Sequence, residues 1–237
     1  MDDKELAVVT GASKGIGKAI SLAFADEGVD VIIFGRDVNA LEKVQAEIKS
    51  KNVRCEYFSG DVGDEKFVHM SVKKIIYVYG KIDHLVNNAG IGIMKKVVDA
   101  SLDEFKKQVD VNLFGVFNFT KAVLPKMIER KSGSIINIAS LAGKNSFIGG
   151  TMYSATKHAL LGFAKSLMLE VREYNIRVAT ICPGSVLTDF NPGGIDPRSK
   201  GEILKAEDVA EAVLSIINLP ARALMSEIDI RPTNPKK

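Results

Sequence analysis

Short apolar runs alternate with longer amphipathic stretches along almost the whole chain. The apolar runs are rich in β-branched residues, and the stretches between them repeat hydrophobic residues at helical spacing. Strands that are apolar throughout and linked by helices are typical of a parallel sheet covered on both faces. The expected strands are 6–10, 29–34, 54–59, 84–87, 134–139, 177–182 and 226–231, and the expected helices are 15–28, 39–49, 64–79, 102–128, 153–174 and 206–218. The pattern predicts one α/β domain with a doubly wound, seven-stranded parallel sheet.

Length and composition agree with a single globular domain. A chain of 237 residues with 46% hydrophobic and 26% charged residues matches an ordinary globular protein. Its 32 basic and 29 acidic residues are dispersed, which argues against nucleic-acid binding. No apolar stretch approaches membrane-spanning length, and the acidic start M-D-D-K-E does not resemble a secretory signal. We therefore expect a cytoplasmic protein with no membrane or nucleic-acid partner.

The sequence gives no support to a metal site or a disulfide. Cys55 and Cys182 lie in separate apolar runs and are expected to be buried free thiols. The histidines His69, His84 and His158 are far apart and lack ligand spacing.

The region after Cys182 is the richest in proline and glycine. We expect residues 183–205 to form either a plain surface loop or a lid that carries Leu187, Phe190 and Ile195. The single domain, 1–237, would then comprise a cofactor-binding and catalytic part (1–182), this loop (183–205), a last helix and strand (206–231) and a frayed tail (232–237).

A glycine-rich turn, T-G-A-S-K-G-I-G, joins the first expected strand to the first expected helix. Glycines at Gly11, Gly15 and Gly17 allow close approach of the backbone, and a helix N-terminus favours a pyrophosphate. A merely tight turn is the alternative, but the place of the motif in the first β-α unit favours a dinucleotide.

The end of the second strand reads F-G-R-D. A cation there would receive the 2′-phosphate of NADP, whereas an acid would bind the 2′-hydroxyl of NAD. Arg36 and Lys14 favour NADP(H) over NAD(H), and Asp37 leaves the other choice open by a shift of one residue. A solvated pair of Arg36 and Asp37 is a third interpretation.

Several motifs in order resemble the short-chain dehydrogenase/reductase family. They are T-G-A-S-K-G-I-G at 10–17, N-N-A-G at 87–90, Asn112, Ser140, the pair Tyr153 and Lys157 in Y-S-A-T-K, and Pro183-Gly184. The resemblance covers nearly the whole chain and implies a Rossmann fold and an NADP(H)-dependent oxidoreductase.

The resemblance also implies the roles of four catalytic residues. Tyr153 would donate a proton to the developing alkoxide, and Lys157 would lower the pKa of that phenol and hold the nicotinamide ribose. Ser140 would hydrogen-bond the substrate oxygen, and Asn112 would anchor a water that links Lys157 to solvent. Taken singly, a Tyr/Lys pair at i,i+4 is more often an amphipathic helix surface. Thr156 has no predicted role.

The same resemblance implies a set of cofactor-binding residues. They are Gly11, Ser13, Lys14, Gly15, Ile16, Gly17, Arg36, Asp61, Val62, Asn88, Ala89, Gly90, Tyr153, Lys157, Pro183, Gly184, Val186 and Thr188. The motif N-N-A-G is also expected to end a strand.

Within the family, the motifs look most like an NADPH-dependent 3-oxoacyl-[acyl-carrier-protein] reductase of fatty acid biosynthesis. The ending M-S-E-I-D-I-R-P-T-N-P-K-K departs from that group and resembles a branch that includes 3-hydroxy-acid and serine-type dehydrogenases. The leading expectation is reduction of a ketone or acyl thioester, with an acyl carrier protein as a candidate partner. Oxidation of a hydroxy acid or polyol is the alternative, and a non-catalytic dinucleotide-binding scaffold ranks last. A homotetramer or homodimer is expected from the family.

Overall fold

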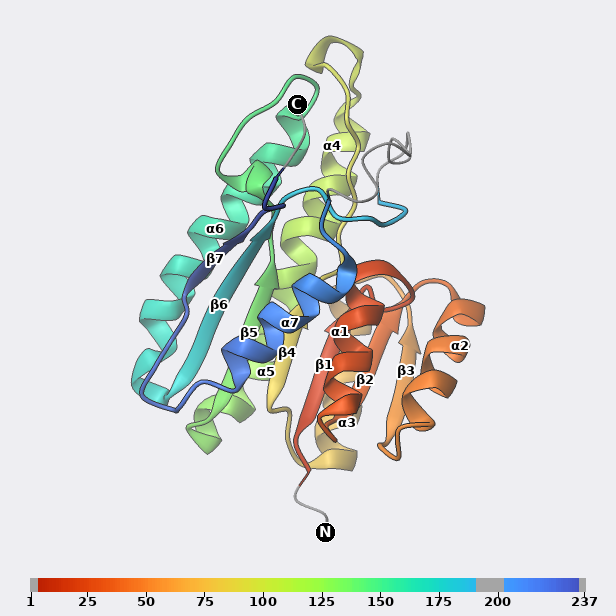
Figure 1. Ribbon diagram of the computed structural model, residues 1–237, viewed down its shortest axis with the longest axis vertical. Coiled ribbons are helices and arrows are strands. Elements are labelled where there is room, and N and C mark those ends of the chain that lie inside the picture. Colours follow the sequence, from red (N-terminus) through yellow and green to blue (C-terminus); the bar gives the residue numbers. More distant parts are fainter. Residues whose placement is uncertain (1–3, 191–202, 235–237) are drawn as a thin grey trace.

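The computed structural model describes residues 4–190 and 203–234, and within them the strands form one parallel sheet (Figure 1). The strands are β1 (Leu6–Thr10), β2 (Asp30–Gly35), β3 (Cys55–Ser59), β4 (His84–Asn87), β5 (Gly133–Ile138), β6 (Ile176–Pro183) and β7 (Glu227–Ile230). Their order is β3-β2-β1-β4-β5-β6-β7, and every neighbouring pair is parallel. The predicted seven-stranded parallel sheet is confirmed.

Helices cover both faces of this sheet. They are α1 (Gly15–Asp26), α2 (Val38–Lys49), α3 (Glu65–Tyr79), α4 (Leu102–Val109), α5 (Gly115–Arg130), α6 (Thr151–Val171) and α7 (Ala206–Ile217). Buried side chains of α1, α2 and α7 form one hydrophobic cluster with the sheet, and those of α3, α5 and α6 form a second. In β1, Ala7 and Val9 belong to the first cluster and Leu6 and Val8 to the second. Because successive side chains of a strand point to opposite faces, both must be apolar, which explains the uninterrupted apolar runs.

The strand order creates a crevice at the carboxyl edge of the sheet. The chain adds β2 and β3 on one side of β1, then crosses to β4 on its other side. At such a reversal the connections after adjacent strands leave in opposite directions, and ligands of open α/β sheets bind there. The turn after β1 and the turn after β4 therefore face each other.

The expected helix 102–128 contains a feature that the sequence did not predict. Helices α4 and α5 are joined without a break by a π-helical turn at Asp110–Phe114. Asn112 lies in this turn, and its side chain bonds the backbone of Ile91 rather than packing along a regular helix. Widened turns of this kind are rare and often mark functional sites.

Other boundaries shift by a few residues. The helix expected at 153–174 begins at Thr151 and ends at Val171, where a 3-10 turn leads to Asn175 with φ 55°. Short 3-10 turns also occur at Val97–Asp99 and Leu141–Gly143. Cys55 and Cys182 are free and buried, as predicted.

Part of the predicted loop lies outside the described residues. Residues 191–202, which include Ile195, lie outside the described residues, as does the end of the expected tail, 235–237. Val186 and Leu204 pair with each other in an isolated β-bridge. None of the described helices has both the length and the apolarity needed to cross a membrane. The described residues also contain no His, Cys, Asp and Glu cluster able to hold a metal ion.

Candidate active site

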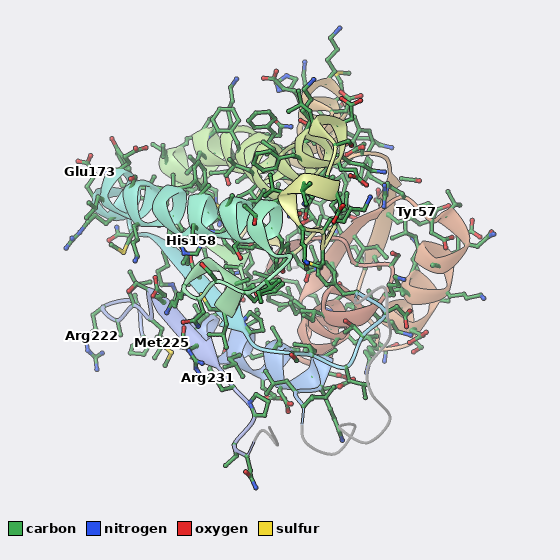
Figure 2. All side chains as sticks on the ribbon, turned by 90° about the horizontal axis from the view of Figure 1, so that it is seen from above. Tyr57, His158, Glu173, Arg222, Met225 and Arg231 are labelled. Atoms are coloured by element: carbon green, nitrogen blue, oxygen red, sulfur yellow. The ribbon has the colours of Figure 1, made fainter. Side chains whose placement is uncertain are left out.

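A cavity of about 1220 Å³ opens at the carboxyl edge of the sheet. The residue directly after each of the seven strands lines it: Gly11, Arg36, Gly60, Asn88, Ala139, Gly184 and Arg231, in the order β1 to β7. The cavity therefore runs across the full width of the sheet. Figure 2 looks down from the top of Figure 1 and shows Tyr57 of β3 and Arg231 after β7 on opposite sides of the molecule.

Nearly all the predicted site residues line this one cavity. They are Gly11, Ser13, Lys14, Gly15, Ile16, Arg36, Asp61, Val62, Asn88, Ala89, Gly90, Ser140, Tyr153, Lys157, Pro183, Gly184, Val186 and Thr188. Two predicted residues, Gly17 and Asn112, do not line it and instead support residues that do.

The glycine turn after β1 has the conformation that its glycines allow. Gly11 and Gly15 have φ angles of +65° and +57°, which residues other than glycine rarely adopt. Gly17 packs so closely that a Cβ atom there would lie 2.4 Å from the carbonyl oxygen of Gly11 and 2.4 Å from Nδ2 of Asn88. Asn88 in turn donates hydrogen bonds to the carbonyls of Thr10 and Gly11, at 2.8 and 3.1 Å. The N-N-A-G segment thus both ends β4 and fixes the glycine turn.

The N-terminus of α1 is suited to an anion. Lys14 is the N-cap residue, its side chain makes no capping hydrogen bond, and the first turn has no acidic residue. By contrast, Asp64 and Ser101 accept hydrogen bonds from the first turns of α3 and α4. The N–H groups and the partial positive charge of α1 therefore remain available to a ligand such as a pyrophosphate, so the turn fits the predicted cofactor.

The structure distinguishes Arg36 from Asp37. Arg36 lines the cavity, whereas Asp37 does not and caps α2 by accepting a hydrogen bond from the N–H of Ala40 at 3.1 Å. In this structure Asp37 thus serves the cap of α2, and Arg36 is the residue of the pair that lines the cavity. Lys14 also lines the cavity and pairs with Asp189 at 3.4 Å, with both side chains exposed.

Ser140, Tyr153 and Lys157 converge near the middle of the cavity. Ser140 follows β5 at the start of a 3-10 turn, and Tyr153 and Lys157 lie one turn apart on α6. Tyr153 is 7% and Lys157 4% exposed, which rules out the interpretation of the pair as a helix surface. Lys157 Nζ donates a hydrogen bond to the carbonyl of Ile138 at 3.0 Å and lies 5.8 Å from the centroid of the Tyr153 ring.

Burial dominates the protonation of this pair. It raises the pKa of Tyr153 to about 12, and a hydrogen bond with the Ser140 side chain acts in the opposite direction. It lowers the pKa of Lys157 to about 8, because the charged ammonium loses its hydration. The pKa of Tyr153 is therefore raised overall, and Lys157 is not among the causes of this shift, so the predicted lowering of the phenol's pKa by Lys157 stays a prediction. The ammonium lies over the ring and bonds a backbone carbonyl.

Asn112 and Thr156 form a buried support behind the catalytic pair. Asn112 Oδ1 accepts from the N–H of Ile91 at 2.8 Å, and its Nδ2 donates to the carbonyl of Ile91 at 2.9 Å and to Thr156 Oγ1 at 3.1 Å. Thr156 Oγ1 donates to the carbonyl of Tyr153 at 2.8 Å. Both N–H hydrogens of the Asn112 amide are thus used within the protein, and the water that it was expected to anchor stays a prediction.

Sequence reasoning missed several residues at the far end of the cavity. Leu141, Asn145, Ser146 and Phe147, in the loop after β5, line the wall together with Arg231 and Pro232 after β7. Phe190, which was predicted as part of a lid, does line the cavity, and its ring centroid lies 5.8 Å from that of Tyr153. For Arg231 a signal was present, because it is the last residue of a predicted strand. The loop residues carry no such pattern.

Comparison with known proteins agrees with this geometry. The family model described as short chain dehydrogenase matches residues 5–195. The chain belongs to the short-chain dehydrogenase family. An uncharacterized oxidoreductase of Staphylococcus aureus (strain MRSA252) is 35% identical over 232 residues, which cover 96% of this chain and 97% of that relative.

Solved structures resemble this short-chain dehydrogenase over almost its full length. An alcohol dehydrogenase from the archaeon Thermococcus sibiricus, complexed with 5-hydroxy-NADP, has a TM-score of 0.91 at 30% identity and covers 99% of this chain and 100% of its own. The closed form of a serine dehydrogenase complexed with NADP+ has a TM-score of 0.89 at 31% identity, with coverage of 98% and 96%. An NAD+-bound xylitol dehydrogenase has a TM-score of 0.88 at 27% identity, with coverage of 98% and 100%. The protein is an oxidoreductase of this family, whose solved relatives bind either cofactor.

Proposed function

We propose that this short-chain dehydrogenase is an NADPH-dependent reductase that converts a ketone into a secondary alcohol, with Tyr153 as the proton donor. The observation that carries the proposal is the convergence of Ser140, Tyr153 and Lys157 in the cavity that also holds Lys14 and Arg36. The three groups supply a proton, a hydrogen bond and a positive charge where a carbonyl is reduced.

A nicotinamide cofactor, held by the glycine turn and the residues around it, would supply the hydride when bound. The phenol of Tyr153 gives its proton to the oxygen on which negative charge develops, and the hydroxyl of Ser140 stabilises that oxygen by a hydrogen bond. A pKa of about 12 keeps Tyr153 protonated at neutral pH, which suits a proton donor better than a base. Lys157, protonated below its pKa of about 8, stabilises the phenolate that remains once the proton has left. These protonation states fit the roles that reduction requires of the two residues.

Support for NADPH comes from two cations at one end of the cavity. Arg36 follows β2 and Lys14 lies in the glycine turn, where both can meet a phosphate on the adenosine ribose. Asp37 accepts a hydrogen bond within the cap of α2 and does not line the cavity, which also supports NADPH over NADH. The NADP complexes of the alcohol and serine dehydrogenases agree with this preference, and the NAD+ complex of xylitol dehydrogenase represents the alternative.

For the substrate, two candidate classes follow. A 3-oxoacyl thioester, presented by an acyl carrier protein, is supported by the motif resemblance alone. Oxidation of a 3-hydroxy acid, as in a serine-type dehydrogenase, is favoured by the likeness to serine dehydrogenase and by Arg231 at the wall of the cavity. The two classes differ in whether an anionic group lies close to the reacting carbon.

Assembly into a homodimer or homotetramer is a further part of the proposal. Phe114 and Phe117, in and beside the π-helical turn, are 50% and 45% exposed, and Leu169 of α6 is 61% exposed. Exposed apolar side chains of this size are suited to contact between copies of the chain. The expected cytoplasmic location likewise remains a proposal.

The catalytic assignment is tested by following NADPH absorbance with purified protein and a panel of ketones, acyl thioesters and oxo acids. Tyr153→Phe should lower kcat by roughly 10²- to 10⁴-fold while NADPH binding is retained, because only the transferred proton is lost. Tyr77→Phe is the matched control, since Tyr77 is 91% exposed and outside the cavity. Equal turnover by wild type and Tyr153→Phe would overturn the proposal.

A further inference from the structure

Arg231 is the charged residue at the β7 end of the cavity. The charged residues among those that line it are Lys14, Arg36, Asp61, Lys157, Asp189 and Arg231. Arg36 and Asp61 follow β2 and β3, and Lys14 in the glycine turn pairs with Asp189. Lys157 is buried and bonded to the backbone. Among the described residues, Arg231 is thus the exposed cation that lies on the opposite side of the catalytic group from the glycine turn.

Neighbouring contacts hold Arg231 beside the loop that carries Ser140. The N–H of Gly184 donates to the carbonyl of Ile230 at 2.8 Å, so the end of β7 is fixed to the end of β6. Lys144, four residues after Ser140, binds both Glu227 at 2.6 Å and Asp229 at 2.5 Å. Asp229 in turn pairs with Nη2 of Arg231 at 3.2 Å.

The ion-pair network leaves Arg231 with unused hydrogen-bonding capacity. A guanidinium has five N–H donors, and the contact with Asp229 uses one of its nitrogens. Asp229 shares its charge with Lys144, so it neutralises Arg231 only in part. The side chain is 53% exposed, and such a group binds a carboxylate more readily than a fully paired one.

We propose that Arg231 binds a carboxylate on the substrate, and that the enzyme acts on short oxo acids and their hydroxy acids in preference to neutral ketones. This inference rests on the proposed reduction at Tyr153 and names its substrate class. The strand after which Ser140 lies, β5, is two places from β7 in the sheet, or roughly 10 Å. A carboxylate a few bonds from the reacting carbonyl, together with the long side chain of Arg231, spans that separation.

The first experiment compares a short oxo acid with its methyl ester, which has the same carbonyl and no charge. Wild type should favour the acid, and Arg231→Met should lower kcat/KM for the acid by roughly 10- to 100-fold, mainly through KM, with the ester almost unchanged. Arg231→Lys should restore part of the lost kcat/KM, because lysine supplies the positive charge but lacks the planar guanidinium that can bind a carboxylate through two N–H groups. Lys165→Met is the matched control: Lys165 pairs with Glu227 of the same network, is 67% exposed and does not line the cavity.

A binding measurement separates failure of this inference from failure of the proposed reaction. In Tyr153→Phe loaded with NADPH, which should not turn over, calorimetry should show tighter binding of the acid than of the ester. Tyr153→Phe/Arg231→Met should lose that difference. If ester and acid bind and react equally well in wild type, or if Arg231→Met weakens both to the same extent, the carboxylate assignment is overturned, even though a Tyr153-dependent reductase remains. If the wild type turns over no substrate but the acid binds through Arg231, the proposed reduction is wrong and the carboxylate site at Arg231 is confirmed.

Discussion

The two ends of the cavity are built in different ways. At the β1 and β2 end, the ligand-facing surface is mainly backbone: two glycines with positive φ, a third under close packing, and the N-terminus of α1 without a side-chain cap. Around the catalytic group, the surface depends on buried polar side chains. Lys157, Thr156 and Asn112 are 4%, 2% and 1% exposed.

This difference determines what each end can tolerate. A backbone cradle keeps its shape as long as no Cβ atom intrudes, and its hydrogen-bonding groups carry no net charge that burial could penalise. Buried polar side chains pay a desolvation cost, and their protonation depends on the groups around them. Substitutions should therefore act through shape at the β1 and β2 end of the cavity, and through charge and hydrogen bonding around the catalytic group.

The largest expected effect concerns the charge of Lys157. Burial lowers its pKa from 10.5 to about 8, so between these values the unfolded chain binds a proton that the folded chain has released. The contribution of Lys157 to the free energy of unfolding should then rise with pH across this window. Relative to Lys157→Met, the wild type should gain on the order of 3 kcal/mol, which corresponds to the size of the pKa shift.

Urea unfolding of both proteins without cofactor, at several pH values between 8 and 10.5, measures this difference. Cys55, Cys182 and Tyr153 have raised pKa values and act in the opposite direction above their ordinary values of 9 and 10, but all three are present in both proteins and cancel in the difference. If the free energies of unfolding of the two proteins change in parallel with pH across the window, Lys157 keeps its ordinary pKa, and burial of charge does not distinguish the catalytic group from the cofactor end.

At the cofactor end, shape is tested by Gly17→Ala. The added Cβ would lie 2.4 Å from the carbonyl oxygen of Gly11, so the turn must move. Overpacking of this kind should destabilise the fold by about 1–3 kcal/mol and weaken NADPH binding as well. Gly162→Ala on α6 is the matched control, because its Cβ would meet nothing within 4 Å and should stabilise the helix by roughly 0.5–1 kcal/mol. Thermal unfolding and NADPH titration of both variants compare their stabilities and cofactor affinities. If Gly17→Ala has the stability and NADPH affinity of the wild type, the turn is not tightly packed at Gly17.

Arg36→Met tests one of the two cations at the cofactor end that are expected to select the ligand. The variant should bind NADPH roughly 10- to 100-fold more weakly, because one charge-assisted contact with the 2′-phosphate is lost. Binding of NADH, which lacks that phosphate, should change little and serves as the internal control. Equal losses for the two cofactors, measured by fluorescence titration, would show that Arg36 does not read the phosphate.

The contrast between the two ends also explains how much the sequence could predict. The sheet and the glycine turn depend on local patterns, namely apolar runs, helical periodicity and the spacing of Gly11, Gly15 and Gly17, and the structure agrees with them. The π-helical turn at Asp110–Phe114 was missed, because the sequence there continues a helical pattern.

The misjudged parts of the site depend on burial, which no local pattern encodes. The sequence places Tyr153 and Lys157 on one helical face, but the sign of the pKa change at Tyr153 follows from its desolvation in the folded protein. The position of Arg231 opposite the glycine turn depends on β7 being the last strand of the sheet. The role of Thr156 required knowing that Asn112, 44 residues away, lies beside it.

Thr156 therefore offers the smallest but most specific test. Thr156→Val keeps the shape of the side chain and removes its hydroxyl, which leaves one N–H of the buried Asn112 amide and the carbonyl of Tyr153 without this partner. An unsatisfied buried donor costs about 1–3 kcal/mol, so the free energy of unfolding should fall by that amount. Thr156→Ser retains the hydroxyl and should recover most of the loss. If the valine variant is as stable as the serine variant, the hydrogen bonds of Thr156 contribute nothing, and the buried support behind Tyr153 is held by packing alone.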